Sequence, residues 1–241
     1  MTRLFIQNVL SENDLFVLDE ENSHYLRNVL RMRLGEEIVI VDKDGFECLS
    51  AINAVDTDAV TVKVLERRPC VSESPCRITL YQSVSKGERM DLTIQKSVEL
   101  GVSRIVPVSS ERCVARPPYD AKKIARWQKI ALEAARQSGR GLIPLIGEPA
   151  DLASALKVAG EDDLVLFPWE EEKGKTLREV LEGKKPSSIS VFIGPEGGYS
   201  LEEADLAREL GAVPVTLGNR ILRTETAGPA VLAMLLYHNE L

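Results

Sequence analysis

The chain has 241 residues, 44% of them hydrophobic, and a formal net charge of −7. This length and composition allow a buried core, and two modest domains fit the pattern better than one large domain. The N-terminus has no basic segment leading into an apolar stretch, and no apolar run approaches ~20 residues, so we expect neither secretion nor a membrane span.

The first ~70 residues predict a small β domain. Short apolar runs at residues 38–41 and 60–64 have the composition of strands, and Asp44-Gly45 marks a turn between them. The polar stretch over residues 66–75, which contains two prolines, is the expected linker. We therefore place the domain boundary at residue 70.

A short amphipathic helix is expected within this first domain. His24, Arg27 and Arg31 recur at helical spacing beside Leu26, Val29 and Leu30, which gives the helix a basic face and an apolar face. Such a helix could serve the structure alone or contribute a surface for an anionic partner.

From residue 78 onward, strand-like runs alternate with helical patterns, which is typical of an α/β sheet. Within this part, Glu133 and Gln137 are four residues apart and share one face of an expected helix, and Arg140 follows a break at Gly139. The three side chains form either a polar cluster that faces a substrate or an ordinary helix terminus with a surface salt bridge.

The basic residues are concentrated in one part of an acidic chain. Residues 104–140 contain nine Lys and Arg, Arg116 among them, and three acidic residues. Their net charge is therefore +6, which leaves a net charge of −13 on the rest of the chain. A localised basic surface suits RNA contact at a defined face, although a run of charges also occurs on any solvated helix.

Four cysteines, Cys48, Cys70, Cys76 and Cys113, show no C-x-x-C pairing and no neighbouring histidine. The spacing indicates neither a zinc site nor a disulfide framework. Reduced thiols in the cytoplasm are the expected state.

The most informative segment is Gly194-Pro195-Glu196-Gly197-Gly198, between an apolar strand over residues 189–193 and a helix over residues 201–206. Ser200 and Glu203 predict a capping box at the start of that helix, and Gly211 predicts its left-handed C-terminal cap. The glycines let the backbone approach a ligand closely. Their spacing matches neither the dinucleotide nor the triphosphate motif, and a tight turn alone would also explain them.

A second loop follows about twenty residues later. Residues 213–217 predict a strand, and Thr224 can cap a last helix that runs through Tyr237. Arg223, Thr224, Glu225 and Thr226 then stand at a strand end, where open α/β sheets bind ligands. Two such loops imply one ligand site.

The chain resembles the RsmE-type ribosomal RNA methyltransferases of the SPOUT class nearly from end to end. The resemblance rests on residues 3–5, 24–31, 95–102 and 133–140 and on the two loops. It implies an α/β fold in which a trefoil-knotted SPOUT domain with a mostly parallel sheet (71–241) follows a PUA-like, RNA-binding β-barrel (1–70). It also implies that S-adenosylmethionine is the methyl donor and that the product is N3-methyluridine in 16S ribosomal RNA of the small subunit. Cys113 stands where relatives often carry serine, and we expect it to affect packing more than chemistry.

The resemblance also assigns site residues. Backbone and side-chain groups of two strand ends and two loops would hold the cofactor: Leu166, Phe167, Gly194, Pro195, Glu196, Gly197, Gly198, Leu217, Gly218, Leu222, Thr224, Glu225 and Thr226. The family match also makes Glu133 a candidate general base. From the chemistry of the acceptor we add the hypothesis that Arg223 stabilises negative charge on the uracil oxygens, unless it pairs with Glu225 or Glu196 and only shapes the loop. Candidate RNA contacts are Arg3, Arg27, Arg31, Gln137 and Arg140. The last helix would form a homodimer.

Methyl transfer from a sulfonium requires no metal, whereas uridine N3 must lose its proton before it can attack. The sequence leaves two alternatives to the N3-uridine methyltransferase. One is a SPOUT ribose 2′-O-methyltransferase, and the other is a non-catalytic RNA-binding or ribosome-assembly factor that keeps the fold.

Overall fold

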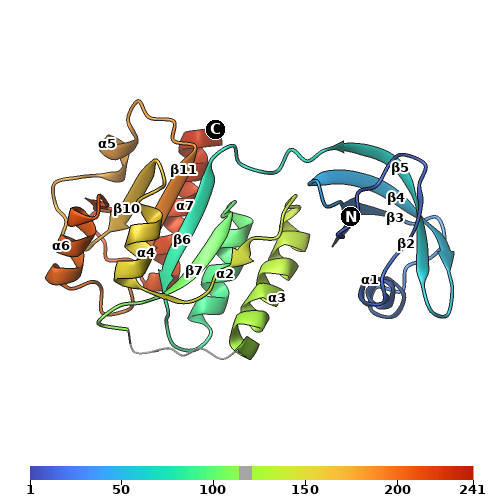
Figure 1. Ribbon diagram of the computed structural model, residues 1–241, viewed down its shortest axis with the longest axis horizontal. Coiled ribbons are helices and arrows are strands. Elements are labelled where there is room, and N and C mark those ends of the chain that lie inside the picture. Colours follow the sequence, from blue (N-terminus) through green and yellow to red (C-terminus); the bar gives the residue numbers. More distant parts are fainter. Residues whose placement is uncertain (114–120, 241) are drawn as a thin grey trace. The chain divides into compact units, whose positions relative to one another are not determined.

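The computed structural model describes residues 1–113 and 121–240 (Figure 1). The chain forms two compact units, Met1–Glu73 with Ala135–Leu142, and Ser74–Ala134 with Ile143–Leu241. The first boundary therefore follows Glu73, three residues beyond the expected position. Strand β5 (Val60–Pro69) continues through the first four residues of the expected linker, because its last residues pair with the start of β4 (Phe46–Val55).

The first unit is built on a five-stranded sheet in the order β1-β3-β4-β5-β2. Strand β1 runs parallel to β3, and the other pairs are antiparallel. Its core gathers apolar side chains such as Leu4, Ile38, Ile40 and Val62, each fully buried. The remaining bounds are β1 (Thr2–Phe5), β2 (Leu15–Val17), α1 (Glu20–His24) and β3 (Glu37–Val41).

The expected amphipathic helix is present only in part. Helix α1 is followed by a π-helical turn over Tyr25–Val29, where the Leu30 amide donates to the Tyr25 carbonyl at 3.0 Å. The wider turn breaks the 3.6-residue spacing, so Leu26 is buried while Val29 and Leu30 are exposed. Arg31 lies beyond the helix with a φ of 54°. The predicted single apolar face over residues 24–31 was therefore wrong.

The second unit contains a seven-stranded sheet in the order β12-β10-β11-β6-β7-β8, with β9 also paired to β7. Every pairing in it is parallel among the described residues, which confirms the expected mostly parallel α/β sheet. Its strands are β6 (Arg77–Ser83), β7 (Arg104–Ser109), β8 (Leu145–Ile146), β9 (Ala150–Asp151), β10 (Leu164–Pro168), β11 (Ser188–Ile193) and β12 (Val213–Val215).

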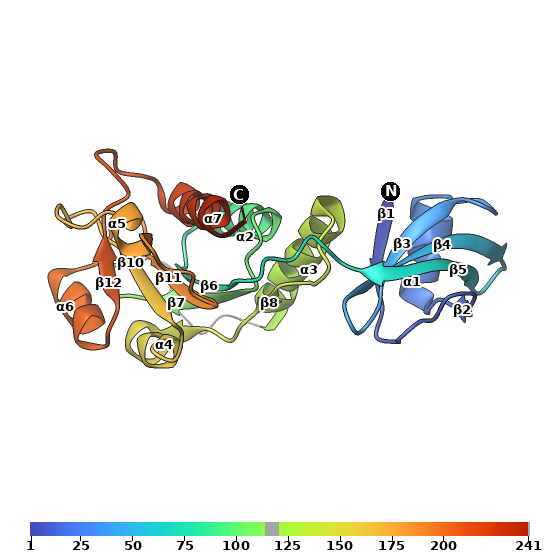
Figure 2. The same ribbon diagram turned by 90° about the horizontal axis from the view of Figure 1, so that it is seen from above.

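Helices cover both faces of this sheet. Figure 2 shows α2 (Arg89–Glu99) and α7 (Thr224–Glu240) on one face, and α4 (Leu152–Ala159) and α6 (Leu201–Glu209) on the other. The remaining helices are α3 (Ala121–Ser138) and α5 (Leu177–Leu181). All six residues of β11 are buried, as expected for a central strand covered on both faces.

Local sequence signals were accurate around the first loop. Ser200 and Glu203 form the predicted capping box at the start of α6, and Gly211 has the predicted left-handed conformation with a φ of 86°. Strand β12, however, ends at Val215, two residues earlier than expected. In the described part of the chain, no helix has both the length and the apolar content needed to cross a bilayer.

Candidate functional site

A cavity of about 650 Å³ lies at the carboxyl ends of β10, β11 and β12. The segments that follow these three strands provide its walls, as is usual for ligand sites in open parallel sheets. The lining residues are Pro168, Trp169, Glu170, Lys173, Ile193, Gly194, Pro195, Glu196, Gly198, Tyr199, Thr216, Leu217, Gly218, Asn219, Arg220, Ile221, Leu222, Arg223, Thr224 and Ala227.

The glycine loop after β11 is fixed by hydrogen bonds from other elements. The Arg112 guanidinium donates to the Gly197 carbonyl at 3.0 Å, and the Trp169 indole donates to the Tyr199 carbonyl at 3.3 Å. The Thr224 hydroxyl donates to the Gly194 carbonyl at 2.7 Å. These donors come from three separate segments, so contacts outside the loop's own sequence hold its backbone.

Gly198 shows why this loop needs glycine. Its φ of 65° lies in the left-handed region, and a Cβ built on it would lie 1.8 Å from Glu170 Oε1. The Glu170 carboxylate therefore occupies the space that a larger residue would fill. An acidic group consequently lies against the glycine loop at the wall of the cavity.

The second loop runs from Thr216 to Arg223. Gly218 has a φ of 105°, and its amide donates to the Thr216 hydroxyl at 3.2 Å, which closes a tight turn. Ile221 is almost completely exposed, and Arg223 is exposed at the rim of the cavity. The loop therefore presents backbone groups to the cavity and an exposed guanidinium, that of Arg223, at the edge of the cavity.

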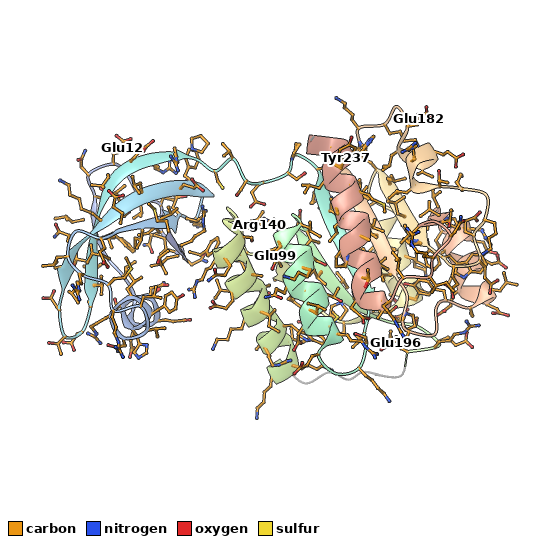
Figure 3. The ribbon with its side chains drawn as sticks, turned by 180° about the vertical axis from the view of Figure 1, so that it is seen from behind. Glu12, Glu99, Arg140, Glu182, Glu196 and Tyr237 are labelled. Atoms are coloured by element: carbon orange, nitrogen blue, oxygen red, sulfur yellow. The ribbon has the colours of Figure 1, made fainter. Side chains whose placement is uncertain are left out.

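Two acidic residues beside the loops share one arginine. Arg89 Nη1 lies 2.6 Å from Glu196 Oε1, and Arg89 Nε lies 3.8 Å from Glu225 Oε1. Figure 3 shows Glu196 near the first turn of α7, at the opposite end of that helix from Tyr237. Burial alone would raise the pKa of Glu196, but hydrogen bonds from backbone amides and from Arg89 outweigh it and hold the pKa below its usual value.

Most of the expected cofactor residues surround this cavity. Those that line it, together with the proposed catalytic Arg223, are Gly194, Pro195, Glu196, Gly198, Leu217, Gly218, Leu222 and Thr224. Gly197 faces Arg112, and Glu225 lines a neighbouring open groove with Arg89. Thr226 is exposed in the first turn of α7.

Leu166 and Phe167 have a different place from the one expected. Both are fully buried, and Phe167 stacks on Tyr199 with ring centroids 4.3 Å apart. The next two residues, Pro168 and Trp169, line the cavity. The part of β10 that lines the cavity therefore starts at Pro168, one residue after Phe167, because the Phe167 side chain is still buried in the core.

The expected polar cluster on α3 is divided. Glu133 and Gln137 are exposed, whereas the Arg140 side chain is only 3% exposed and pairs with Glu73 at 2.6 Å. Gly139, with a φ of 73°, ends the helix and lets the Arg140 amide donate to the Ala135 carbonyl at 3.0 Å. A contact between Arg140 and RNA would require the pair with Glu73 to open.

The candidate RNA contacts of the first unit also differ from one another. Arg3 is largely buried, with Nη2 2.6 Å from Glu47 Oε1 and Nη1 3.0 Å from the Arg140 carbonyl. Arg27 donates to the carbonyls of Asp56 and Thr57. Arg31 is exposed. Of the expected basic stretch, Arg116 lies outside the described residues.

Comparison with known proteins identifies the family. Residues 72–236 match the family model of the RNA methyltransferase domain, and residues 18–65 match that of the RNA methyltransferase PUA domain. The Ribosomal RNA small subunit methyltransferase E of Bacillus subtilis is 32% identical over 251 residues, which cover 100% of this chain and 98% of the relative. The chain belongs to the ribosomal RNA small subunit methyltransferase E family.

Solved structures of similar proteins agree with this family. The methyltransferase E of Neisseria gonorrhoeae bound to S-adenosyl methionine is 36% identical, with a TM-score of 0.88 over 98% of this chain and 97% of that one. A Legionella pneumophila methyltransferase in complex with the same cofactor is 35% identical, with a TM-score of 0.88 and the same coverage. The PUA-like first domain and the methyltransferase second domain of the family are thus confirmed, while the trefoil knot stays a prediction.

Several residues of the site were not predicted from the sequence. Trp169 and Glu170 follow the carboxyl end of β10, so the rule that ligands bind at the carboxyl ends of strands could have found them. Arg89 and Arg112 carried no such signal, because each reaches the loop from a distant part of the chain. Within the described residues, no three His, Cys, Asp or Glu side chains are grouped to hold a metal ion.

Proposed function

We propose that this chain transfers the methyl group of S-adenosylmethionine to N3 of a uridine in 16S ribosomal RNA. The observation that supports this most is that both glycine-containing loops wall one and the same cavity at the strand ends. Together with membership of the family, it favours methyl transfer over a non-catalytic role.

The cavity residues suit S-adenosylmethionine, which supplies an activated methyl on a positively charged sulfonium when bound. Trp169, Ile193 and Leu222 offer apolar surface for an adenine, and the backbones of Gly194, Gly198 and Gly218 allow close approach. Glu170 and Glu196 provide negative charge toward the cationic part of the molecule. We place the cofactor against these residues.

Arg223 is the residue we assign to stabilising the uracil anion. Both carboxylates that could have neutralised it, Glu196 and Glu225, are engaged by Arg89, and Arg223 itself is exposed at the rim of the cavity. A cation there favours loss of the N3 proton, because it stabilises the negative charge left on the uracil. One well-placed donor lowers the free energy of a transition state that carries such charge by about 3 kcal/mol. Turnover of Arg223→Ala at saturating cofactor tests this role, with cofactor affinity as the control.

Glu133 stays our candidate for the general base, because it is exposed on α3 and a carboxylate there can accept a proton from a substrate that docks against this helix. If Glu133 removes the proton, Glu133→Gln changes the pH profile of turnover. If the pH profile of Glu133→Gln is unchanged, a group other than Glu133 removes the N3 proton.

The enzyme is expected to act as a homodimer on the small ribosomal subunit in the cytoplasm. Helix α7 exposes Met234 and Tyr237, which are 43% and 72% exposed and would be covered by a second copy. Light scattering at working concentration tests the dimer, and a monomer would contradict it.

The deciding experiment measures the product. Purified protein is incubated with labelled S-adenosylmethionine and small subunits that lack the modification, and the labelled nucleoside is identified by mass spectrometry. N3-methyluridine at one position supports the proposal, whereas a 2′-O-methylated nucleoside moves the assignment to ribose methylation. Absence of label without cofactor binding favours the non-catalytic alternative.

A further inference from the structure

A buried amide lies behind the two cavity loops. Gln82, the sixth residue of β6, pairs in register with Ile193 of β11, one residue before Gly194. Its side chain is fully buried, and Nε2 donates to the Thr224 hydroxyl at 2.9 Å and to the Ser83 carbonyl at 3.2 Å. Gln82 therefore reaches the start of α7 from the strand next to the first loop.

The orientation of this amide is fixed by its neighbours. The Ser83 carbonyl can only accept a hydrogen bond, so the atom that faces it must be the NH₂ group and not the amide oxygen. The amide oxygen then points toward Gly228, where an added Cβ would lie only 3.3 Å from it. A glycine at this position of α7 leaves the space that the amide needs.

The direction of the Thr224 hydroxyl follows from that of the amide. Its oxygen already accepts from Gln82 Nε2, so its single proton is available for the Gly194 carbonyl, which lies 2.7 Å away. The hydrogen bonds thus form a chain in which the Gln82 amide donates to the Thr224 hydroxyl and that hydroxyl donates to the Gly194 carbonyl.

The hydrogen bond to the Gly194 carbonyl determines how the backbone of the glycine loop is oriented. The next residue is Pro195, which has no N–H, so the carbonyl is the only hydrogen-bonding group of that peptide. Whatever holds this carbonyl sets the orientation of the peptide, and both Gly194 and Pro195 line the cavity.

We infer that Gln82 is a positioning residue of the cofactor site, which orders the glycine loop through the Thr224 hydroxyl without touching the ligand. This inference rests on the proposed binding of S-adenosylmethionine. It assigns a specific task to a residue outside both loops and outside the cavity lining.

The test compares variants that break the chain of hydrogen bonds with one that keeps it. We expect Gln82→Leu and Thr224→Val each to weaken S-adenosylmethionine binding about tenfold, as for the loss of one buried hydrogen bond. Thr224→Ser keeps the hydroxyl and should bind within about twofold of the wild type. Affinities are measured by titration calorimetry on the full chain, and thermal unfolding of each variant shows that it is folded.

Two further measurements separate positioning from general packing. Because the residues act in series, Gln82→Leu combined with Thr224→Val should bind about as the single variants do, with no second loss. Gln82→Glu places a carboxylate that accepts from the Thr224 hydroxyl and withdraws its proton from Gly194. Burial raises the pKa of such a carboxyl, so binding by this variant should recover as the pH falls and the carboxyl becomes a donor.

Wild-type affinity for Gln82→Leu, additive losses in the double variant, or a Gln82→Glu affinity that is low at every pH would each overturn the inference. If the wild-type protein itself does not bind S-adenosylmethionine, the proposed function fails instead. The two failures are therefore distinguishable from the same titrations.

Discussion

Arg89 on α2 connects the glycine loop to the start of α7, with Nη1 2.6 Å from Glu196 Oε1 and Nε 3.8 Å from Glu225 Oε1. Glu196 lies in the loop that follows β11, and Glu225 is the second residue of the last helix. One guanidinium thus joins the two segments that wall the cavity. The Thr224 hydroxyl makes a second link between the same two segments, through its hydrogen bond to the Gly194 carbonyl.

Replacing Arg89 by alanine should raise the pKa of Glu196, because the arginine contributes both a hydrogen bond and its charge to the lowering. Arg89 is 45% exposed and Glu196 is 24% exposed, so solvent screens the pair and the loss of cofactor affinity should stay below about fivefold. An NMR titration of the Glu196 carboxyl measures the pKa. Arg89→Lys, which keeps the charge, is the control, and an unchanged pKa in Arg89→Ala would contradict the assignment.

The two adjacent glycines of the loop should respond differently to alanine. At Gly198 the left-handed φ costs about 1–2 kcal/mol for a residue with a Cβ, and the Cβ would also collide with Glu170. At Gly197 the nearest atom to the added carbon is Arg112 Cβ at 3.3 Å, a tight contact that a small shift can relieve.

We therefore expect Gly198→Ala to weaken S-adenosylmethionine binding at least about tenfold and Gly197→Ala to weaken it only severalfold. Adding Glu170→Ala to Gly198→Ala removes the collision but keeps the strain, so thermal stability should recover in part. The ranking of the two glycines is the decisive result, and equal effects would show that close approach of the ligand matters more than loop geometry.

The sequence predicts those features that depend on neighbouring residues along the chain. The capping box of Ser200 and Glu203, the left-handed Gly211 and the glycine loop all follow from local rules. Gln82 and Glu170 could not be assigned roles in this way, because their partners are brought to them by the pairing of β6, β10 and β11. The π-helical turn at Tyr25–Val29 had no local signal that distinguishes it from an α-helix.

Glu47 makes the first unit sensitive to acid. Burial alone would raise its pKa, but hydrogen bonds from Arg3 and Arg68 and the charge of Arg3 lower it below the usual value of 4.5. A carboxyl with a lowered folded-state pKa stabilises the fold above the unfolded-state pKa, and this stabilisation disappears as the pH falls through the folded-state value.

Glu47→Gln should therefore lower the free energy of unfolding by about 2 kcal/mol at pH 7, with a deficit that shrinks as the pH falls below about 4.5. Urea unfolding of both proteins across this range measures the difference. A deficit that stays constant with pH would show that shape, and not charge, is what Glu47 contributes.

The arginines of the first unit should separate into stabilising residues and RNA contacts. Arg140 is buried and pairs with Glu73, and Arg3 joins Glu47 to the Arg140 carbonyl, so alanine at either position removes a charged hydrogen-bond donor from a partly or fully buried carboxylate. We expect each of these substitutions to cost about 2–4 kcal/mol of stability.

Arg31 is exposed, and Arg31→Ala should leave the unfolding free energy unchanged within about 0.5 kcal/mol. If it contacts a phosphate, the slope of log affinity against log salt should fall by about 0.7–0.9, the value for one released counterion. Fluorescence anisotropy with a labelled small-subunit RNA fragment at several salt concentrations measures this slope. An unchanged slope for Arg31→Ala would remove Arg31 from the RNA surface, because an exposed side chain that alters neither stability nor salt dependence contacts no phosphate.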